Sequence, residues 1–270
     1  MAAFIALTIS GTVGTYELSF TANGLTSATT SVTVTHGAAA SIELTVSATA
    51  KNAQTLATQP VVRILDADGN LVTTGTQSTQ TVELIVSPGA LTGTTQISAS
   101  AGVATFSGIS LLGTAGSHTL TGRIYLPSQL SDNETITLGF GNATKLSLET
   151  SAAGAASGIA LTTQPVLTLR DSSNNVVTGV AHNVAATITP IASTSGTTVS
   201  VNTSTGTATF TALSISGTVG SYSISFSVEG ASSSDVVNVS QDIQLTHGVA
   251  ASVKVVSQPT SGNAGATLSP

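Results

Sequence analysis

The segment Asp66-Ala-Asp-Gly-Asn70 has the residue types best suited to metal chemistry in this sequence. Carboxylate and amide oxygens at alternating positions, with a glycine for a sharp turn, are the pattern of a calcium loop. The corresponding segment Asp171-Ser-Ser-Asn-Asn175 lacks the second carboxylate and the glycine, and no glutamate follows either copy at the spacing of a helix-flanked loop. We therefore expect a hairpin turn at both places, and keep Asp66, Asp68 and Asn70 as a calcium alternative.

Residue types that support catalysis are present, but not in catalytic arrangements. The four histidines, at positions 36, 118, 182 and 247, include no pair with metal-ligand spacing. The chain has no cysteine, no Gly-x-Ser-x-Gly nucleophile elbow and no paired acids at a repeated position. The sequence therefore predicts a protein that is not an enzyme, with no catalytic residues and no cofactor.

The composition excludes further classes of function. The 270 residues include 47 threonines, 38 serines and 26 glycines, but only 6 basic and 12 acidic residues. So few basic residues cannot neutralise a phosphate backbone, so nucleic-acid binding is not expected. The apolar content of 40% is too high for a disordered chain, and no apolar run approaches the roughly 20 residues of a membrane span.

The sequence repeats itself with a period of about 105 residues. The recurring phrases are Gln59-Pro60 with Gln164-Pro165, Ala104–Phe106 with Ala208–Phe210, Ile9–Tyr16 with Ile215–Tyr222, and Thr35–Gly37 with Thr246–Gly248. We expect four segments: the C-terminal part of a preceding repeat (1–36), two complete repeats (37–140 and 141–247) and the N-terminal part of a following repeat (248–270). This division predicts a window from a longer array.

The residues that position these motifs follow a strand pattern. Ser223–Val228 and Ser41–Val46 alternate strictly between polar and apolar residues, which places one face on a core and the other in solvent. Pro60 and Pro165 open such runs, and turn-forming residues separate them. The predicted fold class is all-β, with antiparallel two-sheet sandwiches in tandem.

Three stretches, Gln59–Val72, Ala101–Phe106 and Gly116–Leu120, resemble bacterial immunoglobulin-like domains of the invasin and intimin type. The second copy keeps the same frame, in residues Gln164–Val177, Gly206–Phe210 and Gly220–Ile224. This resemblance implies tandem immunoglobulin-like β-sandwich domains in a modular, extracellular, rod-like surface protein.

Aromatic residues mark the expected core. Phe4, Phe106 and Phe210 recur at the same phase of the repeat, and each would bury a large area. Tyr16 and Tyr222 follow a Gly-Thr or Gly-Ser step and resemble the tyrosine corner of these sandwiches. We assign all five to the structural core, with His118 in the corner position of the first complete repeat.

Tyr125, Leu126 and Leu130 stand where the second complete repeat has small residues. Exposed on a loop, they would form an interaction patch, because aromatic and aliphatic anchors are what interfaces use. The alternative is a loop that folds back on its own domain. Both remain open.

The leading functional hypothesis is a structural, non-catalytic repeat region of an extracellular appendage, filament, sheath or surface layer at the cell surface. Its expected partners are other copies of itself or neighbouring immunoglobulin-like repeats. The alternatives are the stalk of a giant cell-surface adhesin and an accessory region of a secreted enzyme.

Overall fold

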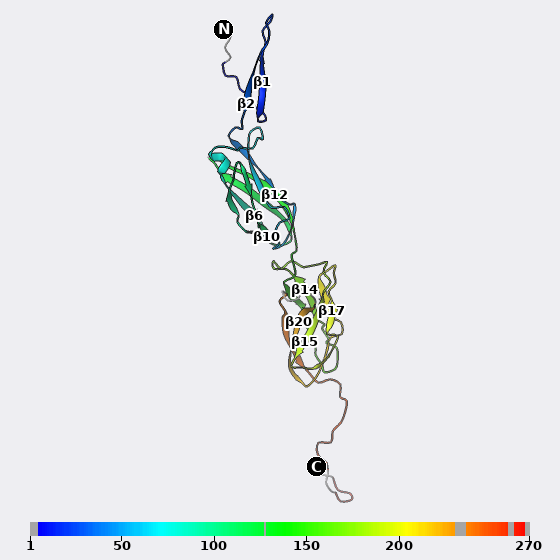
Figure 1. The fold of residues 1–270 in the computed structure, drawn as a ribbon. Coiled ribbons are helices and arrows are strands. Elements are labelled where there is room, and N and C mark those ends of the chain that lie inside the picture. The colour runs from blue at the N-terminus through cyan, green and yellow to red at the C-terminus, as the bar shows by residue number, and fades with distance from the viewer. Residues whose placement is uncertain (1–4, 127, 230–235, 259–261, 268–270) are drawn as a thin grey trace. The chain divides into compact units, whose positions relative to one another are not determined.

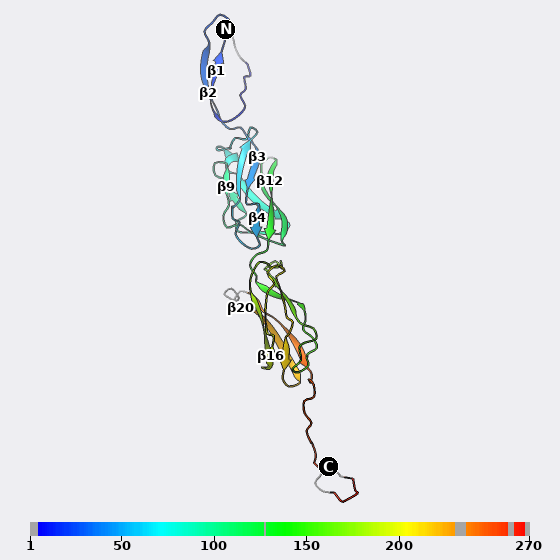
Figure 2. The ribbon, with the colours of Figure 1, turned by 90° about the vertical axis from the view of Figure 1, so that its right-hand side faces the viewer.

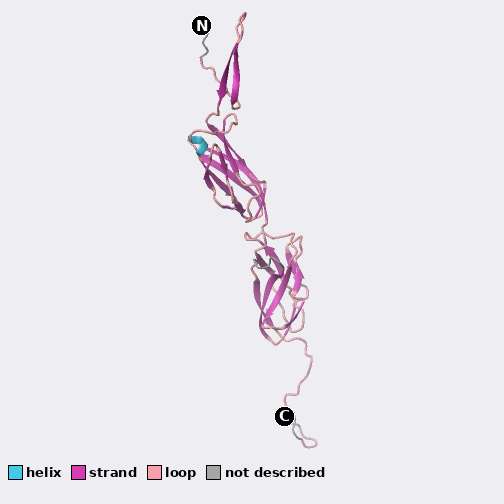
Figure 3. Ribbon diagram, in the orientation of Figure 1, coloured by secondary structure: helices cyan, strands magenta, loops and turns pink. Residues whose placement is uncertain are grey.

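A computed structural model describes residues 5–126, 128–229, 236–258 and 262–267. These residues form strands and connecting loops, and the described part contains no α-helix (Figure 3). One 3-10 turn, η1 (Thr76–Thr79), interrupts the strands. No helix among the described residues is long and apolar enough to cross a membrane. The predicted all-β class is confirmed.

The chain divides into two compact units. The first contains residues 1–145, 169–179 and 204–206, and the second contains residues 146–168, 180–203 and 207–270. The turn that includes Asp171 therefore belongs to the first unit, although the sequence pattern predicts it to be part of the repeat 141–247.

The first sandwich consists of strands β3 to β12 (Figure 1). Its larger sheet has the order β4 (Thr49–Lys51), β12 (Gln129–Gly139), β11 (Gly116–Tyr125), β6 (Thr81–Ser87) and β8 (Gln96–Ser98). The opposing sheet has the order β3 (Ala39–Thr45), β5 (Val61–Asp66) and β9 (Val103–Thr105), and β7 (Ala90–Thr92) pairs with β10 (Ser110–Leu112). All pairs are antiparallel except β4 with β12.

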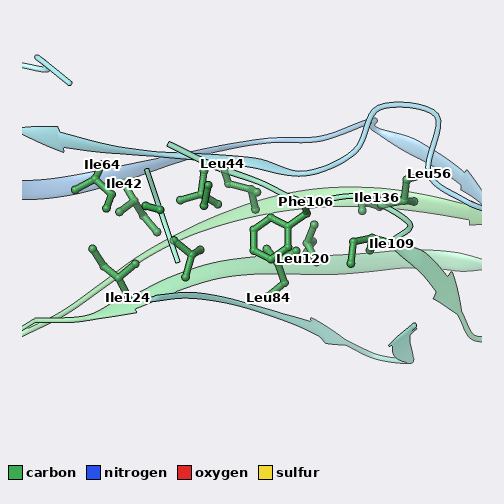
Figure 4. Close-up of a cluster of buried hydrophobic side chains, with 14 of the residues drawn as sticks. Ile42, Leu44, Leu56, Ile64, Leu84, Phe106, Ile109, Leu120, Ile124 and Ile136 are labelled. Carbon is green, nitrogen blue, oxygen red and sulfur yellow. The ribbon is translucent and has the colours of Figure 1, made fainter. Parts of the chain in front are cut away.

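The core of the first sandwich is built by alternation along these strands. On β11, His118, Leu120, Gly122 and Ile124 are buried, while the residues between them are exposed or half-buried. Figure 4 shows Phe106, which is 2% exposed, among side chains from both sheets. Burying one face of each sheet against the other is what stabilises such a domain, at roughly 25 cal/mol per Å² of apolar surface.

The second sandwich consists of strands β13 to β21 (Figure 2). One sheet has the order β13 (Lys145–Thr150), β14 (Val166–Arg170) and β18 (Thr207–Thr209). The other has the order β17 (Thr198–Ser200), β15 (Asn183–Thr189), β20 (Gly220–Glu229) and β21 (Val239–Leu245), and β16 (Ser193–Ser195) pairs with β19 (Ser214–Ser216). Phe210 is 1% exposed and its ring lies 5.6 Å from that of Phe226, centroid to centroid.

The recurring Gln-Pro step has a structural reason. The Gln59 side chain donates to the carbonyl oxygens of Leu56 (2.8 Å) and Ile109 (3.2 Å) and accepts from the Ile109 N–H (2.7 Å). Gln164 makes the same three bonds, with Leu161 and Leu213 as partners. The glutamine thus adds side-chain hydrogen bonds to two loops that also pair directly, through the Leu56 N–H and the Ile109 carbonyl (3.0 Å) in the first sandwich.

Residues 14–34 form a separate hairpin in the first unit, β1 (Gly14–Phe20) with β2 (Ala28–Val34). No second sheet covers this hairpin among the described residues, so Tyr16 is 37% exposed, which differs from its expected place in the core. The equivalent Tyr222, which has a sandwich around it, is 5% exposed. Phe4 lies outside the described residues.

Candidate functional site

The Asp66–Asn70 turn closes strand β5. The Asp66 N–H donates to the Asn70 carbonyl (2.9 Å), and Gly69 adopts the positive φ (81°) that a side chain disfavours. One carboxylate oxygen of Asp66, Oδ1, accepts the N–H groups of Asp68 (3.0 Å) and Asn70 (2.8 Å). This aspartate therefore holds the turn by accepting from backbone ahead of it in the chain.

The Asp171–Asn175 turn has the same geometry without the glycine. Asp171 N–H donates to the Asn175 carbonyl (3.0 Å), and Asp171 Oδ1 accepts from the N–H groups of Ser173 (3.0 Å) and Asn175 (2.9 Å). Asn174 takes the positive φ (70°) in place of Gly69. Asparagine tolerates this region better than other side chains do, so the turn survives the loss of the glycine.

The second oxygen of each aspartate is also used. Oδ2 of Asp66 accepts from the Gly37 N–H (2.7 Å) and the Asn70 side chain (3.0 Å). Oδ2 of Asp171 accepts from the Gly141 N–H (2.8 Å) and the Asn175 side chain (3.0 Å). N–H groups therefore point at the oxygens that a cation would need, including Asp68 Oδ2, which accepts from the Gly11 N–H at 3.0 Å. Within the described ranges, no group of three or more His, Asp or Glu side chains is placed to hold a metal.

These hydrogen bonds favour the charged form of both aspartates. The N–H of Gly37 and then the Asn70 amide hold the pKa of Asp66 at about 2, below its ordinary value of 3.8. Burial raises the pKa of Asp171, but the bonds from Gly141 and Asn175 outweigh it, and the net direction is downward.

The asparagine at the end of each turn contacts a loop far away in sequence. Asn70 Oδ1 accepts from the Val13 N–H (2.9 Å), and its Nδ2 donates to the Gly11 carbonyl (2.9 Å). Asn175 does the same with the Ala115 N–H (2.7 Å) and the Gly113 carbonyl (3.0 Å). We call this pair of hydrogen bonds the docking contact. Both copies lie within the first compact unit.

In each docking contact, the asparagine bonds the backbone of a loop, which we call the receiving loop. An aromatic ring holds this loop by contacting the carbonyl oxygen of the residue four positions before it. Tyr16 Oη donates to the Thr12 carbonyl at 2.7 Å. His118 Nε2 lies 2.8 Å from the Thr114 carbonyl oxygen, and the other nitrogen, Nδ1, lies 2.6 Å from the Pro88 carbonyl oxygen. The ring thus orders the loop backbone independently of the asparagine. This preorganisation lowers the entropy cost of forming the docking contact.

The two docking contacts also differ in the side chain that accepts from the glycine N–H of the receiving loop. Gly11 N–H donates to Asp68, whereas Gly113 N–H donates to Asn52 Oδ1 (3.0 Å). Asn52 is 1% exposed and also donates to Asp171 Oδ2 (2.9 Å). A Cβ on Gly141 would collide with the Asn52 carbonyl oxygen, so a glycine is needed at this close approach.

The expected interaction patch is divided in the structure. Leu126 and Leu130 are half-buried and pack against the core of the first sandwich. Tyr125 is 56% exposed, and the Arg123 guanidinium lies 5.3 Å from its ring centroid. Arg123 in turn donates to Glu83 at 2.7 Å and lowers the pKa of that carboxyl. Tyr125 is therefore the member of this patch that faces solvent. Its ring packs against Arg123, which is paired with Glu83.

The sequence interpretation missed Asn52, Asn175 and the backbone of Gly11 and Gly113. One signal was available: the first and last positions, Asp and Asn, are identical in both turns, while the three between them vary. A turn alone requires no asparagine at its last position, so the repetition there indicated a contact.

No family model and no curated protein matches this sequence. Similar solved structures include the Escherichia coli adhesin FdeC, at 18% identity and a TM-score of 0.40, covering 86% of this chain and 74% of that one. The D00-D0 domain of intimin matches at 14% identity and a TM-score of 0.38, covering 76% and 99%. Escherichia coli alpha-2-macroglobulin activated by porcine elastase matches at 10% identity and a TM-score of 0.33, covering 87% of this chain but only 25% of its own length. Likeness at this level does not extend to function.

Proposed function

We propose that this chain is a structural, non-catalytic region of an extracellular assembly at the cell surface, an appendage, filament, sheath or surface layer, built of tandem immunoglobulin-like repeats. The observation that carries the proposal is the docking contact, made twice with the same atoms at equivalent positions. A repeated backbone-directed contact suits a protein whose task is to hold domains in a defined order.

Composition supports the same role. With 6 basic and 12 acidic residues in 270, little charge repulsion opposes close contact between copies. The described surface instead offers hydroxyl groups of serine and threonine, which donate and accept hydrogen bonds with neighbouring chains.

The test is the state of the purified chain over a range of concentrations, followed by sedimentation and electron microscopy. We expect ordered polymers, because the protein's net charge of −6 is too small to prevent copies from associating. A chain that stays monomeric at every concentration would contradict an assembling role, and would favour the alternative of an adhesin stalk.

A further inference from the structure

The second sandwich contains a loop, Gly217–Tyr222, with the receiving geometry of the docking contact. Tyr222 Oη donates to the Thr218 carbonyl at 2.9 Å, as Tyr16 does to Thr12. Gly220 has a φ of 155°, close to the 142° of Gly116 in the first sandwich. A ring four residues along the chain therefore holds this loop backbone, as Tyr16 holds the loop that receives Asn70 and His118 holds the loop that receives Asn175.

The support beneath this loop is also reproduced. Ser157 Oγ accepts from the Gly217 N–H at 3.1 Å, in the position where Asn52 accepts from Gly113. A Cβ on Gly248 would collide with the Ser157 carbonyl oxygen, just as one on Gly141 would collide with that of Asn52. Two supporting features of the first loop therefore recur at the second: a side-chain acceptor for the glycine N–H and a glycine at the close approach.

The Gly217–Val219 loop differs from the other two loops in its hydrogen-bond partners, because no asparagine side chain bonds it in the described part of the chain. Val219 stands where Val13 and Ala115 stand, and it is 67% exposed. Its N–H, the group that donates to an asparagine in both docking contacts, has no acceptor among residues 5–126, 128–229, 236–258 and 262–267. The Gly217 carbonyl has only the Ser157 hydroxyl at 3.1 Å within that part of the chain, which leaves its second lone pair free.

We propose that the Gly217–Val219 loop is the docking site for another immunoglobulin-like domain that carries an Asp-x-x-x-Asn turn. The asparagine of that turn accepts from the Val219 N–H and donates to the Gly217 carbonyl. A carboxylate in its place has no donor for the carbonyl, and an alkyl side chain has neither group, so the site selects asparagine at this position. The inference rests on the proposed function and specifies which partner a repeat accepts.

The test uses an extended chain in which residues 248–270 are replaced by a second copy of residues 37–140. This fusion preserves the Thr-His-Gly sequence at the junction, and the strands of that copy enclose one buried cluster by themselves. The measurement is amide hydrogen exchange at Val219, with Ala115 in the same molecule as an internal standard. We expect Val219 exchange to slow by about tenfold or more relative to the 270-residue chain.

The matched control is the same extended chain with Asn→Ala at the Asn70 position of the appended copy only. Val219 exchange should return to its rate in the 270-residue chain, while the Phe106 core of the appended copy stays folded. Unchanged Val219 exchange beside a folded copy would overturn the proposal, as would slowing that survives the control. Polymer formation by the 270-residue chain is measured separately, so a failed docking site and a failed assembly role are distinguishable.

Discussion

Asn175 illustrates how much a single amide can organise in this protein. Its side chain bonds Asp171 within its own turn and the backbone of Gly113 and Ala115 in a distant loop. Those three bonds use both its acceptor and its two donors, which no other residue of similar size can supply. Asn70 likewise uses both its side-chain oxygen and its side-chain N–H groups, with Val13, Gly11 and Asp66 as partners.

Replacing Asn175 with alanine should destabilise the docking contact. The loss of these partly buried hydrogen bonds should cost about 1–3 kcal/mol, and Ala115 amide exchange should accelerate correspondingly. Exposed Asn142, whose side-chain oxygen accepts a hydrogen bond from Gln54 (3.0 Å), serves as the matched control, and Asn142→Ala should leave Ala115 exchange unchanged. Equal exchange in wild type and Asn175→Ala would show that Ala115 is protected by other groups.

Acid should loosen the Asp66 turn. The folded pKa of about 2 lies below the ordinary 3.8, so the folded state binds a proton less readily than the unfolded chain does. The resulting stability is fully present above about pH 4 and is lost as pH falls towards 2. Thermal unfolding and Gly37 amide exchange, followed across this window, should both show it.

Asp66→Asn is the control for the acid response, because an amide does not titrate. Its stability should be lower at neutral pH and flatter between pH 4 and pH 2. If the stability of the wild type changed as little between pH 4 and pH 2 as that of the variant, Asp66 would not be the source of the acid response.

At the scale of elements, each sandwich has its own aromatic centre. Phe106 packs between side chains of both sheets in the first sandwich, and Phe210 packs against Phe226 in the second (Figure 4 for the first). The Gln59 and Gln164 bonds join the neighbouring loops to these centres, through Ile109 and Leu213 respectively.

Phe106→Ala and Phe210→Ala should each destabilise their own sandwich by about 3–5 kcal/mol, because each removes a buried aromatic side chain and leaves a cavity. Two-transition thermal unfolding, or exchange at core amides of each sandwich, separates the effects. Ile191→Ala, at a side chain that is 98% exposed, is the control and should change stability little. Parallel loss of both sandwiches in either phenylalanine variant would contradict independent cores.

At the scale of the whole molecule, the predictions concern how repeats are connected. The segments Thr35–Gly37, Phe140–Gly141 and His247–Gly248 contain no flexible Pro/Ser/Gly linker. We predict an elongated particle with limited bending in small-angle scattering. A compact, folded-over particle would refute the prediction.

Lateral association between chains should depend little on salt, because few ion pairs are available to screen. Tyr125→Ser tests the exposed aromatic and should weaken association, whereas Leu126→Ser and Leu130→Ser would disturb side chains that pack on the core. Sedimentation at low and high salt provides the measurement. Dissociation at high salt would point to charged contacts, and unaffected association of Tyr125→Ser would shift the contact to strand edges or hydroxyl faces.

The sequence was sufficient for features that depend on near neighbours in the chain. Alternation along Ser41–Val46 and Ser223–Val228 predicted strands with one buried face, and the structure has β3 and β20 there. Phe106 and Phe210 occupy equivalent positions of the repeat, and each fills the core of its own sandwich with a large side chain. The turn residues at Asp66 and Asp171 likewise act on backbone only two and four positions away.

The docking contact could be decided only by tertiary structure. Asn70 and Val13 are 57 positions apart, and Asn175 and Ala115 are 60 apart, so no local pattern relates them. The partners on the receiving side are backbone groups, which carry no side-chain signature. Whether Tyr16 is covered was equally invisible, since its local sequence matches that of Tyr222 and only the presence of an opposing sheet separates 37% from 5% exposure. Local sequence determined which segments become strands and turns because those choices depend on short-range sterics and hydrogen bonds. Folding decided which turn meets which loop, because that depends on groups brought together from distant parts of the chain.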